Sequence, residues 1–352
     1  MATAERLDPP PGAPRPTGRE SRLQESLLTR WRRRAVTIPA IYLLWALATV
    51  LAPLLLVAAL LLDGARRSRL VLTRAVMFFL VFLWFEAVAL VATLLVWPLV
   101  VHPDTFRHLN ARLQVWWNAG LFRAGCVIFG MRVVVEGRDV LQREGPLLVL
   151  VRHVSTVDAV IPVTLLSDVG RHLFRFVLKR ELLTDPCLDV VGNRLPNCFV
   201  KRESDVRDDE VARVVGLLEG MGGEEALVIY PEGTRFSPSR RTRLLEKMPP
   251  GPPRELATTL QHTLPPLTRG TLALLGANRH ADLVILGHTG LEGAAAFPDF
   301  IRGGLVGTTI HVWVRRIPRE RIPADEAGQI ALLSDEWRRM DGLIEAHRRA
   351  VM

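Results

Sequence analysis

A histidine and an aspartate five residues apart directly follow an apolar run of strand length. The run is Leu147–Val151, and the pair is His153 and Asp158. A histidine at the carboxyl end of a strand lies where α/β proteins form their sites. A turn starting near Ser155 would bring the carboxylate to one imidazole nitrogen and leave the other to act as a base. The pair therefore indicates general-base chemistry, although a helix-capping serine beside a chance histidine gives the same pattern.

A second apolar run, Ala226–Tyr230, leads into the segment Pro-Glu-Gly-Thr-Arg at residues 231–235. Gly233 lets the backbone approach a ligand closely, while Thr234 and Arg235 add a hydroxyl and a guanidinium. This combination suits a phosphate, and its alternative is an ordinary β-turn with a surface arginine.

Two further groups of cations lie between these segments. Lys201 and Arg202 lie at the end of one predicted strand, and Lys179 begins the segment Lys179–Leu182. They hold two of the three lysines in the chain. Either they bind an anionic substrate, or they form a solvated charged face.

Taken together, the motifs resemble the glycerophospholipid acyltransferase family, the 1-acylglycerol-3-phosphate acyltransferases and their relatives. The first family block, Asn-His-x4-Asp, is similar to the segment 152–158, and the third matches residues 231–235. The second block looks like Lys179–Leu182, Gly192 and Phe199–Arg202.

Other segments place the resemblance more finely. C-terminal segments, among them 264–270 and 337–341, resemble the lysocardiolipin acyltransferase branch. Arg152 stands where the family usually has Asn, and Lys201 stands where an acidic residue is common.

This resemblance implies transfer of a fatty acyl group from an acyl thioester to a hydroxyl of a lysophospholipid. The expected acceptor is 1-acylglycerol 3-phosphate, giving phosphatidic acid, with acyl-CoA or acyl-ACP as co-substrate and no cofactor or metal. His153 would be the catalytic base and Asp158 would orient it. The implied substrate-binding residues are Lys179, Lys201, Arg202, Glu232, Gly233, Thr234 and Arg235.

Three alternatives remain open at this point. The acceptor could be another lysophospholipid, glycerol 3-phosphate or dihydroxyacetone phosphate. A hydrolase would use Ser155 as nucleophile, but no Gly-x-Ser-x-Gly elbow is present in the sequence. A non-catalytic membrane scaffold could retain the same fold.

The elements that must position these residues point to an α/β domain over residues 104–352. Apolar runs of strand length alternate with helical patterns, which predicts a mixed, mostly parallel sheet with flanking helices. The predicted strands are 132–136, 147–151, 174–178, 198–201, 226–230, 282–286 and 308–314. The predicted helices are 157–166, 208–221, 269–276 and 326–349, with a surface excursion at 238–253.

Two long apolar segments precede this domain. Residues 35–62 contain no charged side chain, and residues 75–101 contain only Glu86. Each exceeds the roughly 20 residues that cross a hydrocarbon core. We therefore expect a membrane helical hairpin over 35–101, after a disordered basic tail at 1–34, with Pro39 and Pro53 kinking or ending the first helix.

Arginines at the ends of the hairpin give two possible arrangements. More of them flank the hairpin than lie in its loop, which favours both ends, and the catalytic domain, on the cytoplasmic side of the cell membrane. A hairpin that dips into one leaflet would instead keep every arginine on one side. Glu86 is either a functional intramembrane carboxylate or a structural one.

Composition excludes several other classes. The net charge is +9, but the arginines are spread along the chain, and nucleic-acid-binding motifs are missing from the sequence. An anionic lipid membrane explains the charge, so we expect no nucleic-acid partner. The three cysteines lack a Cys-x-x-Cys spacing, which fits a reducing compartment without a thiolate metal site.

Overall fold

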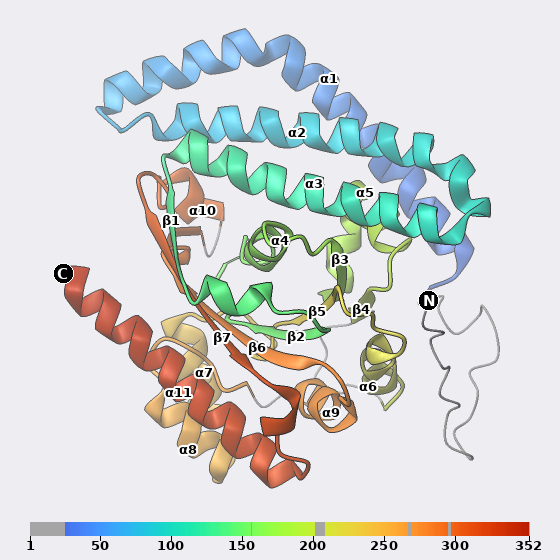
Figure 1. Ribbon diagram of the computed structural model, residues 1–352. Helices are drawn as coiled ribbons and strands as arrows, with labels where there is room; N and C mark the ends of the chain where they lie inside the picture. Colours follow the sequence, from blue (N-terminus) through green and yellow to red (C-terminus); the bar gives the residue numbers. More distant parts are fainter. Residues whose placement is uncertain (1–24, 156, 201–207, 267–268, 295–296, 352) are drawn as a thin grey trace.

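A seven-stranded sheet forms the centre of the molecule (Figure 1). The computed structural model describes residues 25–155, 157–200, 208–266, 269–294 and 297–351. The strand order is β1-β7-β6-β2-β5-β3-β4. The strands are β1 (Arg132–Glu136), β2 (Leu147–Val151), β3 (Leu173–Lys179), β4 (Cys198–Val200), β5 (Glu225–Ile229), β6 (Asp282–Thr289) and β7 (Thr309–Ile317).

The sheet is mixed and mostly parallel, as the sequence predicts. Strands β6, β2, β5, β3 and β4 run parallel to one another, whereas β7 is antiparallel to β6 and β1 is parallel to β7. The central strand β2 is buried along its whole length. Because both of its faces are covered, its sequence is a continuous apolar run without alternation.

Helices cover both faces of the sheet. Along β2, Val149 packs in the core beneath α4, and Leu150 packs in the core beneath α9 and α11. Successive side chains of a strand point to opposite faces, so one strand contributes to both cores. The helices of the domain are α4 (Val160–Ser167), α5 (Pro186–Gly192), α6 (Asp208–Val215), α7 (Pro238–Lys247), α8 (Pro252–Thr259), α9 (Arg269–Ala277), α10 (Phe297–Ile301) and α11 (Glu326–Val351).

Three long helices form a further layer over the α4 side of the domain (Figure 1). They are α1 (Leu27–Arg66), α2 (Val71–Val96) and α3 (Pro103–Phe129), with a short 3-10 turn at Trp97–Val101. Both predicted apolar segments lie in this layer, and α1 and α2 are long and apolar enough to cross a membrane. Pro39 and Pro53 lie inside α1, which continues through both prolines.

The structure differs from the sequence-based expectation at several places, and the short helices α5 and α10 are among the elements that were not predicted. Helix α3 was not expected, because its polar and aromatic residues obscure the apolar stripe that packs on α2 and α4. The predicted surface excursion at 238–253 contains α7 and the start of α8. Residues 27–34, assigned to the basic tail, begin α1.

Candidate active site

His153 and Asp158 are in direct contact at the carboxyl end of β2. The Nδ1 atom of His153 lies 3.0 Å from Oδ2 of Asp158. Asp158 is fully buried, whereas the side chain of His153 retains 17% of its exposure. With the proton on Nδ1 donated to the carboxylate, Nε2 remains as the basic nitrogen of the ring. This geometry fits the general base that the sequence predicts.

A tight turn holds the carboxylate of Asp158 in place. Its Oδ2 also accepts hydrogen bonds from the backbone N–H groups of Val154 at 2.5 Å and Ser155 at 2.8 Å. Ser155 is buried, and its hydroxyl donates to the carbonyl of Ala294 at 2.8 Å. The serine is therefore engaged in packing the turn, which does not favour the hydrolase alternative.

The Pro-Glu-Gly-Thr-Arg segment forms a turn beside this pair. The N–H of Gly233 donates to the carbonyl of Tyr230 at 3.0 Å, and Gly233 has φ = +66°, which favours glycine. The N–H of Phe236 donates to the carbonyl of His153 at 2.6 Å. Thr234 and Arg235 are partly exposed next to that bond. The turn that suits a phosphate therefore lies against the candidate base.

Glu232 faces the protein interior. Its two carboxylate oxygens accept from the backbone N–H groups of His153 at 3.2 Å and Leu264 at 3.1 Å. Burial raises the pKa of this carboxyl group to about 8, against the opposing effect of the nearby Arg152 guanidinium. Among the substrate-binding residues that the resemblance implies, Glu232 accepts backbone N–H groups and so links the turn after β5 to the turn after β2.

Arg152, which replaces the usual Asn, is fully buried behind the site. Its guanidinium donates to the carbonyl of His288 at 2.6 Å, to the carbonyl of His262 at 2.7 Å and to Oε1 of Glu292 at 2.8 Å. This arrangement fastens the end of β2 to the end of β6 and to the segment before α9. The positive charge also holds the pKa of Glu292 down at about 2, against the opposing effect of burial.

Of the three other predicted substrate-binding residues, the structure describes only Lys179. Lys179 ends β3, a strand that is separated from β2 by β5. Lys201 and Arg202 lie outside the described residues. Within the described ranges no group of three or more His, Cys, Asp and Glu side chains could hold a metal ion.

Three residues around the site were not singled out from the sequence. Tyr230 places its ring 4.8 Å from that of His153, measured between ring centroids. His288 lies behind Asp158, and Glu292 pairs with Arg152. Only the position of Tyr230, directly before Pro231, gave a signal, because contacts between residues 130 or more positions apart carry no local pattern.

Comparison with known proteins agrees with this architecture. The model of the family described as Acyltransferase matches residues 132–256. The crystal structure of the 1-acyl-sn-glycerophosphate acyltransferase PlsC from Thermotoga maritima superimposes with a TM-score of 0.50 at 14% identity. It covers 78% of this chain and 98% of its own, and at this identity it supports the fold alone.

Two mouse proteins are similar in sequence. The 1-acyl-sn-glycerol-3-phosphate acyltransferase epsilon of Mus musculus is 25% identical over 226 residues, which is 61% of this chain and 61% of the relative. The gamma protein is 24% identical over 278 residues, covering 73% of this chain and 68% of the relative. This chain therefore spans somewhat less than two thirds of the epsilon protein's length.

The fold is that of an α/β protein in which a contacting His–Asp pair lies beside a glycine turn at the carboxyl ends of two adjacent strands. Residues 132–256 match the acyltransferase family model, and the chain shows distant homology to the 1-acylglycerol-3-phosphate acyltransferases. This confirms the resemblance drawn from the sequence.

Proposed function

We propose that the protein transfers a fatty acyl group from acyl-CoA to the free hydroxyl of 1-acylglycerol 3-phosphate, forming phosphatidic acid. The observation that carries this proposal is the 3.0 Å contact between His153 and Asp158, with the Gly233 turn hydrogen-bonded to the His153 backbone. A base and an anion-binding turn on adjacent strands can hold a phosphate-bearing alcohol with its hydroxyl at the base.

In the proposed reaction, Nε2 of His153 takes the proton from the acceptor hydroxyl as its oxygen attacks the thioester carbonyl. Asp158 stabilises the imidazolium that forms. The carbon–sulfur bond then breaks, and the CoA thiolate leaves with the proton returned from His153. General-base catalysis supplies about 10²- to 10⁴-fold, and positioning supplies the remainder.

The substrate phosphate is assigned to the turn after β5. Gly233 presents backbone at a position without a side chain, while Thr234 and Arg235 add a hydroxyl and a cation. Lys179, Lys201 and Arg202 are proposed as further contacts to anionic groups of the two substrates. The carboxyl group of Glu232 supports the turn and not the substrate.

We further propose that the α1–α2 hairpin lies in one leaflet of the cell membrane, parallel to its plane, with the catalytic domain on the cytoplasmic side. Helix α2 borders the domain from Val71, which packs against Gly303, to Thr93, whose carbonyl accepts from Arg194. These 23 residues extend about 33 Å, close to the thickness of a hydrocarbon core. If the hairpin crossed the bilayer, the polar domain that packs along α2 would have to enter the hydrocarbon core.

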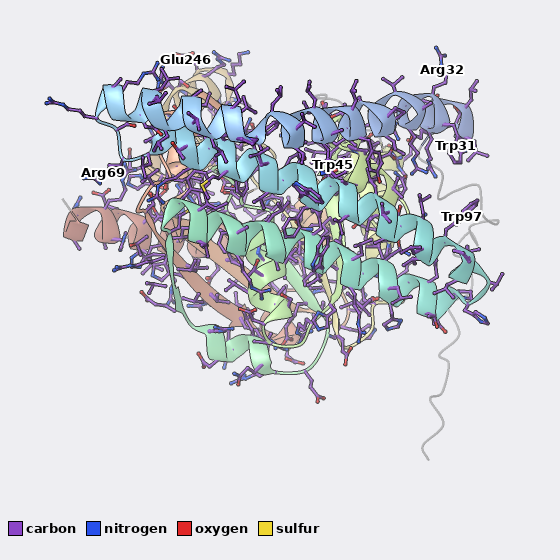
Figure 2. The ribbon with its side chains drawn as sticks, turned by 90° about the horizontal axis from the view of Figure 1, so that it is seen from above. Trp31, Arg32, Trp45, Arg69, Trp97 and Glu246 are labelled. Atoms are coloured by element: carbon purple, nitrogen blue, oxygen red, sulfur yellow. The ribbon has the colours of Figure 1, made fainter. Side chains whose placement is uncertain are left out.

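Charged side chains at both ends of the hairpin support the same arrangement. Figure 2 shows Trp31, Arg32 and Trp97 at one end and Arg69 at the other. Arg33 donates to the buried Asp189 of α5 at the first end, at 2.9 and 3.0 Å. Both ends would then lie at one lipid–water interface, and the apolar face of α1 would be buried among acyl chains.

Acyl transfer from labelled oleoyl-CoA tests the proposed reaction. Purified wild type and His153→Ala would be offered 1-acylglycerol 3-phosphate, glycerol 3-phosphate and several lysophospholipids with larger head groups. Ester formation by wild type alone, fastest with 1-acylglycerol 3-phosphate, is expected. A different preferred acceptor would reassign the substrate, and equal activity in the variant would overturn the base. Transfer to no acceptor from either oleoyl-CoA or oleoyl-ACP would favour the scaffold alternative.

A further inference from the structure

A second buried histidine, His288, faces the same carboxylate as His153. It lies near the end of β6, a strand paired with β2, and its side chain is fully buried. Its Nε2 atom is 3.6 Å from Oδ1 of Asp158 and 3.1 Å from the carbonyl oxygen of Arg152. Asp158 thus lies between two imidazoles, with Oδ2 toward His153 and Oδ1 toward His288.

The protonation of His288 follows from its surroundings. Nε2 faces two oxygen acceptors, whereas Nδ1 is buried without a hydrogen-bond partner among the described residues. The proton therefore belongs on Nε2. Burial is the largest effect on His288 and lowers its pKa, with Arg152 acting in the same direction and Asp158 and Glu292 opposing it. The ring is neutral and acts as an N–H donor.

The carboxylate of Asp158 needs such a donor. Its Oδ2 accepts three hydrogen bonds, but its buried Oδ1 has none within hydrogen-bond distance among the described residues. Desolvating a carboxylate oxygen without a partner is costly. The Nε2–H of His288 donates to the Arg152 carbonyl at 3.1 Å, and the same nitrogen lies 3.6 Å from Oδ1 of Asp158. The phenol of Tyr230 and the carboxyl group of Glu232 are two further titratable groups that interact electrostatically with Asp158.

Arg152 fixes His288 in this position. The two residues hold each other reciprocally: the Arg152 guanidinium donates to the His288 carbonyl at 2.6 Å, and the His288 ring donates to the Arg152 carbonyl at 3.1 Å. His288 is thereby joined to the residue directly before His153. The ring cannot swing away from Asp158 without breaking the link between β2 and β6.

We propose that His288 is a positioning residue that holds Asp158 through Oδ1 and so keeps Oδ2 directed at Nδ1 of the catalytic base. This inference rests on the proposed function, in which His153 removes the acceptor proton. It adds a third member to the His153–Asp158 pair, and that member acts through the carboxylate without touching substrate.

Substitutions that separate hydrogen bonding from volume test this inference. His288→Gln keeps an N–H donor near the position of Nε2, and His288→Leu removes the donor at similar size. The Leu variant should lower kcat between about tenfold and a hundredfold, with little change in KM for the acceptor, because a hydrogen bond to a charged group is lost. The Gln variant should recover most of that loss. His311→Leu, which removes an imidazole on β7 that packs against His347, is the matched control.

Two further measurements make the test decisive. When the Leu substitution is added to Asp158→Asn, no further loss of kcat is expected, because His288 acts through Asp158. Imidazole 15N shifts should report one Nδ1-protonated tautomer of His153 in wild type and His288→Gln, and a mixture in His288→Leu. Circular dichroism and the Tm of each variant establish that it is folded.

The NMR measurement also separates this inference from the proposed function. Should wild type acylate no acceptor, the proposed function fails, while the tautomer of His153 still reports the role of His288. An unchanged tautomer in His288→Leu, or equal kcat losses in the Leu and Gln variants, would overturn the positioning role.

Discussion

The buried carboxyl group of Glu232 joins the two turns of the site, accepting the backbone N–H of His153 at 3.2 Å. Its second oxygen accepts the N–H of Leu264 at 3.1 Å. The turn after β5 and the segment before α9 therefore meet at the residue that carries the base. Because Glu232 accepts backbone N–H groups, these hydrogen bonds determine the position of His153 and do not determine which substrate binds there.

Substitution of the orienting carboxylate should impair the chemical step and spare binding. Asp158→Asn is expected to lower kcat by about 10²- to 10⁴-fold, because the amide neither fixes the Nδ1–H tautomer nor stabilises the imidazolium. KM for the acceptor should change little. Steady-state kinetics with 1-acylglycerol 3-phosphate measures both quantities, and a rise in KM at constant kcat would speak against this role.

Removal of the guanidinium after the glycine turn should weaken phosphate binding selectively. Arg235→Ala is expected to raise KM for 1-acylglycerol 3-phosphate about tenfold or more, because a charge-assisted hydrogen bond is lost. KM for a phosphate-free monoacylglycerol should stay within about twofold of wild type. Arg279→Ala, an exposed arginine beyond α9, is the control, and equal losses for both acceptors would refute the phosphate contact.

Loss of the partner of Arg152 should destabilise the fold in a pH-dependent way. Glu292→Gln leaves a fully buried guanidinium without its counter-charge and should cost about 3 kcal/mol near neutral pH. The pKa of Glu292 is about 2 in the folded protein and lies well above that in the unfolded chain. The Arg152–Glu292 pair therefore stabilises the folded protein fully above pH 4.5. This stabilisation is lost as the pH falls from 4.5 to about 2.

Denaturant unfolding of wild type and Glu292→Gln from pH 7 to pH 3 would measure this difference. The difference in free energy of unfolding between the two proteins should become smaller as the pH falls. If this difference in free energy of unfolding is absent at pH 7, or grows on acidification, Glu292 does not compensate the charge of Arg152.

Replacement of the buried serine distinguishes the transferase from the hydrolase alternative. The hydroxyl of Ser155 donates to the Ala294 carbonyl, so Ser155→Ala should cost about 1 kcal/mol of stability. Acyl transfer should remain within about threefold of wild type at a temperature where both are folded, since such a packing contact lies outside the chemical step. Complete loss of activity in the folded variant would instead identify Ser155 as a nucleophile.

The orientation of the hairpin can be tested by labelling its two ends. In a Cys126→Ser background, single cysteines at the exposed positions of Arg32 and Arg69 should react with a membrane-impermeant maleimide from the same side of sealed vesicles. The other two cysteines, Cys187 and Cys198, are buried. Reaction from opposite sides would show that the hairpin spans the bilayer.

The sequence was sufficient for most of the sheet and for the core of the site. Strand β2 is a continuous apolar run, β5 is apolar after Glu225, and the His153–Asp158 pair lies within a single turn. Helix α3 was missed because its buried face includes Asn110, Gln114 and Asn118. These amides bond to helix carbonyls or lie in the packed layer, which local hydropathy cannot reveal.

The supporting residues could not be found in the same way. Arg152 was a visible departure from the family pattern, but its partners His262, His288 and Glu292 lie 110 to 140 positions further along the chain. Only the pairing of β2 with β6 brings them together. The role of a buried arginine is therefore determined by strand order, which single-sequence patterns do not specify.

The central claim is that His153 activates the acceptor hydroxyl for attack on a thioester. Its most direct test measures released CoA thiol and newly formed phosphatidic acid in the same samples, for wild type and His153→Ala in lipid vesicles. Wild type should form the two products in a one-to-one ratio, and the folded variant should form neither above background. Phosphatidic acid formation by His153→Ala at the wild-type rate would contradict the account.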